Sequence, residues 1–525
     1  METVERRAPE PAAEATDEGP AGEQPVGETL DRRSLFRWPV TAAMAAMGGV
    51  VLAACDFTSA TFDRRVHLLK RLTYGATPAS RDRITAIGET AWLNEQLAPQ
   101  TLDLTAITAK VAALPALSQT AAQLFANYSA GGAARFAAAE LQLASAIRAV
   151  ESPAQLHERM VEFWSDHFNV PAQDTALYLL KIVEDRDSIR PHALGKFKDL
   201  VVQSALSPAM LYYLDNYRSS VGAINENYGR ELLELHTLGV TGGYTETDVV
   251  NTARLLTGWT INTTTWKFEF AQAKHDASPL TIMGWTRPTT GHPWLHGVVF
   301  LQWLAVQPQT AQFVCTKIAR RFVSDSPDAG MVTAMTNAWL ANDSAIGPVI
   351  RTMVAHPAFD ASTGAKFRRP LDYFQFVLRS LGASVAPTTN QTQLARIGGA
   401  LDGLGQLPFN WPAPNGYPDV EGAWLNTGAM LARWNLVGDI VGRGFQPITY
   451  STTTLRATLT GRTAPQIYDL VAQHLVLENV TSTGRGFLNS QLGWTDTLQP
   501  TGPQIDAALP TILVAVLGAA DAQYR

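Results

Sequence analysis

The run NENYGRELLELH, residues 225–236, decides the fold class that the sequence predicts. At about 100° per residue, its charged side chains fall within an arc of about 140°, and Tyr228 and the leucines fall on the other side. A run with one apolar and one charged face is an amphipathic helix. The same spacing recurs along the chain after residue 63, interrupted by Pro, Gly or Ser-Pro. The sequence therefore predicts a mainly α-helical fold.

The segment 259–300 breaks this helical pattern. Trp266, Phe268 and Phe270 alternate with polar residues at period two, which indicates a half-buried strand. We expect a small β-hairpin insertion around 264–284, with residues 280–283 as the partner strand. Neither a repeat of fixed period nor a second domain with its own composition is visible. We expect one multi-helix domain over 63–525, with a family-like core over about 63–440 and a C-terminal helical part over about 441–525.

The N-terminal segment predicts the destination of the protein. Residues 1–31 are acidic, rich in Ala, Pro and Gly, and predicted to be disordered. Arg32-Arg33 precede the uncharged run Trp38–Ala54, and the sequence Leu-Ala-Ala-Cys ends at Cys55. These two features make residues 32–55 typical of a twin-arginine lipoprotein signal. A transmembrane helix is the alternative, but the run is shorter than the roughly 20 residues of a span. We expect lipid attachment at Cys55, a short tether over 56–62, and anchoring to the outer face of the cytoplasmic membrane.

Charge and cysteine content exclude some kinds of partner and site. Removal of residues 1–54 takes 5 of 41 basic and 9 of 47 acidic residues, which leaves 36 against 38. Such a balance argues against a nucleic-acid partner, which favours a concentrated basic face. Because the lipid would occupy Cys55, Cys315 is the one cysteine left with a free thiol, and its apolar neighbours predict a buried thiol rather than a nucleophile.

The first candidate site is the charged arc of the opening helix. It carries Glu226, Asn227, Arg230, Glu231 and Glu234. Three carboxylates on one face can ligate a metal ion, with an arginine that orients one of them. The alternative is a solvated face with ion pairs at i,i+4, each worth about 0.3 kcal/mol.

Two further candidates carry histidines. His167 is centred on the apolar stripe of residues 156–168, so it either donates a hydrogen bond to a backbone group or binds a metal. His275-Asp276 follows the aromatic strand and offers two ligands to one ion. Asp248 stands three residues after Thr245, which is the spacing of a capping box at a helix start.

A family resemblance joins these places. The sequence resembles the bacterial family known as domain of unknown function 1800. The resemblance lies in the blocks 225–240, 242–249 and 253–260, with support from 67–78, 164–168, 189–195 and 416–426. The resemblance implies an exported, mainly helical domain that is often encoded beside an exported sulfatase-like protein, and it implies no established reaction. In that family a lysine usually follows the His-Asp pair. Here Ala277 takes its place, and the next lysine is Lys317.

Two functions of different class remain open. The first is a binding or scaffold lipoprotein that serves the sulfatase-like protein or a cell-surface polymer. Trp411 and Trp424 are candidates for a stacking platform in such a protein, but core packing is the favoured interpretation of both side chains. The second is a metal-dependent hydrolase that holds one divalent metal ion. We expect the candidate residues to meet in one pocket. The expected metal ligands are His167, Glu231, Glu234, His275 and Asp276. The expected catalytic residues are Glu226, Arg230, Asp248 and Arg254, with Arg190 and Asn227 beside them.

Overall fold

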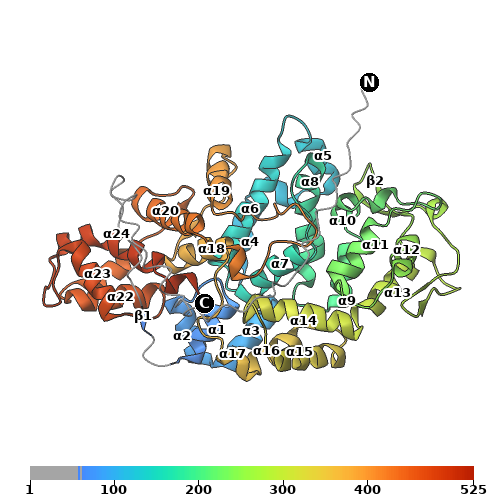
Figure 1. Ribbon diagram of the computed structural model, residues 1–525. Coiled ribbons are helices and arrows are strands. Elements are labelled where there is room, and N and C mark those ends of the chain that lie inside the picture. The colour runs from blue at the N-terminus through green and yellow to red at the C-terminus, as the bar shows by residue number, and fades with distance from the viewer. Residues whose placement is uncertain (1–56, 59–61) are drawn as a thin grey trace, which may run out of the picture.

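The computed structural model describes residues 57–58 and 62–525. The acidic segment 1–31, the signal 32–55 and Cys55 lie outside the described residues. The fold is mainly helical and elongated, with α22–α24 at one end, α11–α13 at the other, and α7, α14 and α18 in the middle (Figure 1). The predicted fold class is confirmed.

The first half of the chain supplies helices α1 to α12, of which α1, α3 and α6 pack against α7. Their bounds are α1 Arg64–Leu72, α2 Pro78–Ile87, α3 Glu89–Leu97, α4 Thr105–Ala112, α5 Ala121–Tyr128, α6 Ala134–Glu151, α7 Gln155–His167, α8 Thr175–Val183, α9 Phe197–Ala205, α10 Pro208–Tyr213, α11 Asn227–Glu231 and α12 Glu246–Leu255. Two π-helical segments, Glu184–Ile189 and Leu232–Thr237, continue α8 and α11.

The second half supplies the remaining helices. They are α13 Pro293–Ala305, α14 Pro308–Phe322, α15 Ala329–Ala341, α16 Ile346–Ala355, α17 Pro357–Asp360, α18 Pro370–Ser380, α19 Gln391–Gly403, α20 Thr427–Arg443, α21 Thr453–Leu459, α22 Ala464–Leu475, α23 Ser482–Leu492 and α24 Gly502–Gly518. The described part of the chain contains no helix that is long and apolar enough to cross a membrane.

The strands form four two-stranded antiparallel sheets. They pair β1 Phe57–Thr58 with β8 Asn479–Val480, β2 Trp259–Asn262 with β3 Lys267–Phe270, β4 Thr281–Ile282 with β5 Trp285–Thr286, and β6 Ser384–Val385 with β7 Ile448–Thr449. The predicted partnership of the aromatic strand with 280–283 is wrong. The aromatic strand β3 pairs instead with the segment before it, because Asn262 accepts hydrogen bonds from the backbone of Thr264 and Thr265 and closes a local turn.

The apolar spacing of the sequence predicts one helix over 84–98 and another over 102–128, and the structure splits both. The predicted helix 84–98 is divided at Gly88, which has φ +82° and separates α2 from α3. The predicted helix 102–128 is divided near Pro115, which lacks the amide hydrogen that a continued helix needs. Helix α13 was not predicted, because it lies within the segment that the aromatic alternation marked as extended.

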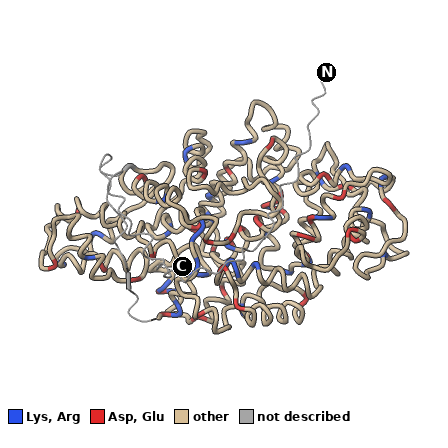
Figure 2. Tube along the Cα trace, viewed as in Figure 1, with Lys and Arg blue, Asp and Glu red and all other residues tan. Residues whose placement is uncertain are grey.

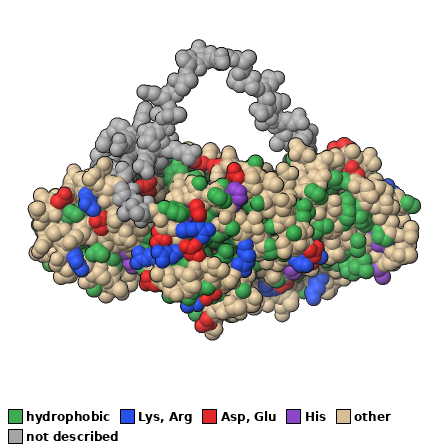
Figure 3. Space-filling view, turned by 90° about the horizontal axis from the view of Figure 1, so that it is seen from below, with side chains coloured by type: hydrophobic (Ala, Val, Ile, Leu, Met, Phe, Trp, Pro, Cys, Tyr) green, Lys and Arg blue, Asp and Glu red, His purple; other side chains and the backbone are tan. Residues whose placement is uncertain are grey.

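The hydrophobic core consists of two clusters. One gathers α6, α18, α20, α22 and α24, and the other gathers α7, α9, α14, α15 and α16. Basic and acidic residues lie side by side in the middle of the molecule (Figure 2), where elements of the two clusters meet. Hydrophobic side chains gather at the end that carries α13 (Figure 3), where Leu295 and Val299 are exposed.

Candidate functional site

A cavity of about 320 Å³ lies between α7, α14, the start of α18 and the segment 411–420. Its volume falls in the range of small-molecule sites. The lining side chains come from positions more than 250 residues apart in the sequence: Phe163, Asp166, His167, Lys317, Arg320, Arg321, Arg369, Trp411, Asn415, Gly416, Tyr417, Pro418, Asp419 and Val420.

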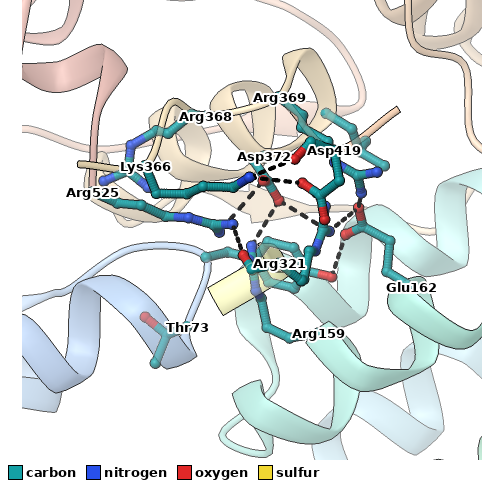
Figure 4. Close-up of polar contacts among 12 residues, drawn as sticks. Thr73, Arg159, Glu162, Arg321, Lys366, Arg368, Arg369, Asp372, Asp419 and Arg525 are labelled. Atoms are coloured by element: carbon teal, nitrogen blue, oxygen red, sulfur yellow. Dashed lines mark hydrogen bonds and ion pairs between the residues drawn. The ribbon is translucent and has the colours of Figure 1, made fainter. Parts of the chain in front are cut away.

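A buried ion-pair network forms the base of this cavity (Figure 4). Arg321 donates to Glu162 over 2.5 Å, and Arg369 donates to Asp166 over 2.6 Å and also to Glu162. Arg159 donates to Asp372 over 2.7 Å, with both side chains fully buried. These pairs join α7 and α14 of one hydrophobic cluster to α18 of the other, so the network fixes how the two clusters meet.

The basic side chains of the network lower the pKa values of two of its buried carboxyl groups. Burial alone would raise the pKa of the Asp372 carboxyl, but the guanidinium groups of Arg159, Arg321 and Arg525 hold that pKa well below its usual range. Asp419 behaves likewise, with Lys366 and Arg321 opposite it at 3.3 and 3.6 Å. The carboxylates of Asp372 and Asp419 therefore stay charged at neutral pH.

The segment 411–420 closes the cavity by a tight contact at Gly416. Its φ is +72°, and a Cβ there would stand 2.1 Å from the backbone oxygen of Asp166, so only glycine fits. Asn169 donates hydrogen bonds to the carbonyls of Trp411 and Ala413, over 2.8 and 2.7 Å. Trp411 is half-buried in the wall, whereas Trp424 is buried and donates to the carbonyl of Pro418. Trp424 therefore packs in the core, as the favoured interpretation of the sequence predicted, whereas Trp411 lines the cavity.

Lys317 differs from the other charged side chains of the cavity. It makes no hydrogen bond or ion pair to any described residue, and its ammonium lies 5.5 Å from the centroid of the Phe313 ring. Burial lowers its pKa to about 8, while the carboxylates of Asp166 and Asp419 act in the opposite direction. At neutral pH it therefore remains a mostly protonated cation that is available to a ligand.

The charged arc of the opening helix lies elsewhere, on the surface. Arg230 donates to Glu246 over 2.9 and 2.6 Å and lies 3.4 and 3.7 Å from Glu234 and Glu226. Glu226 and Asn227 are exposed. This arrangement is the solvated face with i,i+4 pairs that was the alternative to a metal site.

Glu231 is the exception on this helix. No described residue forms a hydrogen bond or ion pair with its carboxyl group, which lies near Tyr213. Burial and the nearby charge of Glu234 raise its pKa to about 7, although Arg230 acts against this. A carboxyl group in this state is largely protonated below pH 7.

Both predicted histidines are engaged by backbone carbonyls. His167 is buried, and its Nε2 donates to the carbonyl of His236 over 3.0 Å. His275 donates from Nδ1 to the carbonyl of Thr257 over 2.7 Å and accepts at Nε2 from Arg287 over 2.9 Å. With both ring nitrogens occupied, His275 has none left for a metal.

The remaining predicted residues are paired locally. Arg254 donates to Asp276 over 2.8 Å, and Arg190 donates to Glu158 over 2.7 Å and to Asp185 over 2.8 Å. Asp248 completes the capping box with Thr245 and accepts from the backbone of Met283. Its predicted capping role is confirmed.

The structure does not bring the predicted ligands together. Within residues 57–58 and 62–525, no three His, Cys, Asp or Glu side chains are placed to hold a metal ion. Arg254, His275 and Asp276 share one cluster, Glu226, Arg230 and Glu234 share a second, and His167 lies at the cavity. The expectation of one pocket is wrong, because the charged arc lies on the surface and His275 and Asp276 are held by Thr257, Arg287 and Arg254.

Sequence reasoning did not single out the arginines of the cavity. Arg321 lies on the buried stripe that also carries Val314 and Ile318, and Arg369 directly precedes the helix start at Pro370. A charged residue on an apolar helical stripe is the signal that identifies such a site, because a buried charge requires a partner.

Comparison with known proteins gives one result. A family model, described as a protein of unknown function and designated DUF1800, matches residues 67–523. No curated protein and no solved structure matches the chain.

Proposed function

Because the chain belongs to the DUF1800 family, whose function is unknown, we propose from its own geometry that it is a binding protein of the cell envelope. The cavity between α7, α14 and the segment 411–420 is the proposed binding pocket. One observation carries this proposal: the charged walls of the cavity are held in fixed positions by a buried ion-pair network. Walls fixed before binding reduce the ordering entropy that a ligand must overcome.

The alternative of a metal-dependent hydrolase has less support. His275 has both ring nitrogens in hydrogen bonds, and Asp276 is held by Arg254. A metal would have to displace these partners before it could bind.

The proposed location is the outer face of the cytoplasmic membrane, reached by the twin-arginine route. Its support is the sequence Arg32-Arg33 with Cys55, the proposed site of the lipid anchor. Phe57–Thr58 pairs with β8 only two residues after Cys55. An anchor at Cys55 would therefore hold the α22–α24 end of the molecule next to the membrane.

A cell-surface polymer is the proposed occupant. A polymer presents small groups at intervals, and one such group fits a cavity of about 320 Å³. An exported sulfatase-like protein is proposed as the partner at the surface, on the family resemblance alone.

Co-sedimentation with isolated cell-wall glycan tests the pocket. Val420→Trp places an indole in the cavity wall, and Leu431→Trp makes the same change on α20, where the side chain has the same exposed fraction of 38%. We expect the wild type and Leu431→Trp to sediment with the glycan and Val420→Trp to remain in solution. Equal sedimentation of both variants would show that the glycan does not bind in the cavity.

A further inference from the structure

The charge of the cavity walls indicates the class of ligand. Four basic side chains line the cavity, Lys317, Arg320, Arg321 and Arg369, against the two carboxylates of Asp166 and Asp419. Both carboxylates are already opposed by cations of the network: Asp166 by Arg369 over 2.6 Å, and Asp419 by Lys366 and Arg321. A cationic ligand would find no carboxylate without an opposing cation. Arg321 and Arg369 are likewise opposed by Glu162, but Lys317 and Arg320 form no ion pair with a described residue, so the wall offers unopposed positive charge to an anion.

Several donors at the cavity lack an acceptor. The Nε and Nη1 atoms of Arg321 and the Nε atom of Arg369 are buried without a hydrogen-bond partner among the described residues. Arg320 uses its Nε on the backbone carbonyl of Asp325, over 3.2 Å. A ligand that fits these walls is rich in acceptor oxygens, because buried donors gain most from a new acceptor.

Lys317 is the cation with no partner of its own. The ammonium group presents three donors to the cavity, and the nearest aromatic ring, that of Phe313, contacts it only through its face. An ammonium without a counter-ion in a partly buried wall is the point where an anionic ligand gains the most.

We propose, on the basis of the binding function proposed above, that this cavity binds a phosphate or sulfate group carried by an organic residue, with Lys317 as its direct ligand. The group lies against Lys317 and Arg320, and the organic residue lies against the half-buried ring of Trp411. That ring is held in place by the hydrogen bond from its Nε1 to Asn415, over 2.8 Å.

Calorimetric titration of the purified protein tests this. The probes are inorganic sulfate and inorganic phosphate, with glucose as a neutral probe and ethylammonium as a cationic one. We expect both anions to bind and the other two probes to give no heat. Lys317→Gln should weaken sulfate binding at least tenfold, Lys317→Arg should restore it, and Lys198→Gln, on the surface beside Asp343, should leave it unchanged.

The pH dependence separates Lys317 from the arginines. Sulfate keeps its charge from pH 6 to 10, so loss of its affinity over pH 7–9 reports Lys317, whose pKa is about 8. The charged groups that face Lys317 are Asp166, Asp419 and Arg320, with His167 and His236 beside them. Burial lowers the pKa of His236 to about 3, so it is neutral over this range. His167 stays neutral throughout, because burial lowers its pKa well below the usual value.

The outcomes distinguish this inference from the proposed function. Unchanged sulfate binding in Lys317→Gln overturns the assignment of Lys317. Binding of glucose or ethylammonium, without binding of either anion, would contradict an anionic ligand. The same conclusion would follow if the glycan bound in the cavity but neither sulfate nor phosphate bound. If none of the probes and no glycan bind, the cavity is not a binding pocket. Binding of phosphate but not sulfate, or the reverse, identifies which group the ligand carries.

Discussion

Arg159 and Asp372 form a fully buried ion pair of 2.7 Å that joins α7 to α18, and with them the two hydrophobic clusters of the molecule. Arg321 and Arg525 lie 3.5 and 3.4 Å from the same carboxylate. A single acid thus opposes three guanidinium groups. Removal of its charge would leave all three with less compensation in a fully buried region.

Asp372→Asn is therefore expected to lower the free energy of unfolding by about 3–5 kcal/mol, the range for breaking a buried pair. Asp343→Asn removes the same charge from a surface pair with Lys196 and Lys198, where the Asp343 side chain is 47% exposed. This control should lose less than about 1 kcal/mol. Urea unfolding followed by circular dichroism measures both, and equal losses would contradict a structural network.

Gly416→Ala is expected to displace the segment 411–420 from α7. The new Cβ would stand 2.1 Å from the oxygen of Asp166, at a φ of +72°. We expect a loss of about 1–3 kcal/mol in stability and faster hydrogen exchange in the segment. Gly422→Ala has open space around its Cβ and is the control. Wild-type exchange rates in Gly416→Ala would show that the contact is not needed.

Glu231 gives the protein a pH dependence of its own. Its folded-state pKa is about 7, against an ordinary value of 4.5. As pH rises from about 4.5 to 7, the unfolded chain ionises first, so this group lowers the free energy of unfolding across that window.

Glu231→Gln should remove this slope and stabilise the protein above pH 7 by about 1 kcal/mol, a value reduced for the partial exposure of the side chain. The exposed Glu226→Gln should change stability by less than about 0.5 kcal/mol. Thermal unfolding at pH 5 and pH 8 distinguishes them. A stabilisation that is the same at both pH values would rule out titration of Glu231.

Chelation tests the hydrolase alternative. Of the five ligands of the predicted metal site, all but Glu231 are hydrogen-bonded to other groups. We therefore expect dialysis against EDTA to leave the melting temperature unchanged, and Glu231→Ala to remain folded. A fall in melting temperature that is restored by one divalent metal, and abolished in Glu231→Ala, would favour the hydrolase instead.

The sequence predicted the helical fold because amphipathic spacing survives in single helices. The stripe of Leu156, Met160 and Phe163 on α7 is buried as expected. Cys315 is buried too. Boundaries were less predictable: Gly88 ends a helix by one backbone angle, and β3 pairs with β2 because of the turn at Asn262.

The candidate site was harder to predict, because charged residues in a sequence look like surface residues. The arc around Arg230 has ligand chemistry but lies in solvent. Arg321 and Arg369 look like ordinary surface arginines but are almost fully buried. Their partners are distant in sequence, and the cavity exists only where α7, α14 and the segment 411–420 meet.

Protection of Lys317 tests the central claim most directly. With a pKa of about 8, roughly half of its amine is neutral at pH 8, against about 1 in 300 for an ordinary lysine. Brief treatment with an acetylating ester, followed by mass spectrometry, measures the labelling rate of each lysine. We expect Lys317 to be labelled early and sulfate to slow it several-fold, while labelling of Lys110, which is paired with Glu151, stays unchanged. Labelling of Lys317 at the same rate with and without sulfate and phosphate would contradict an anion pocket.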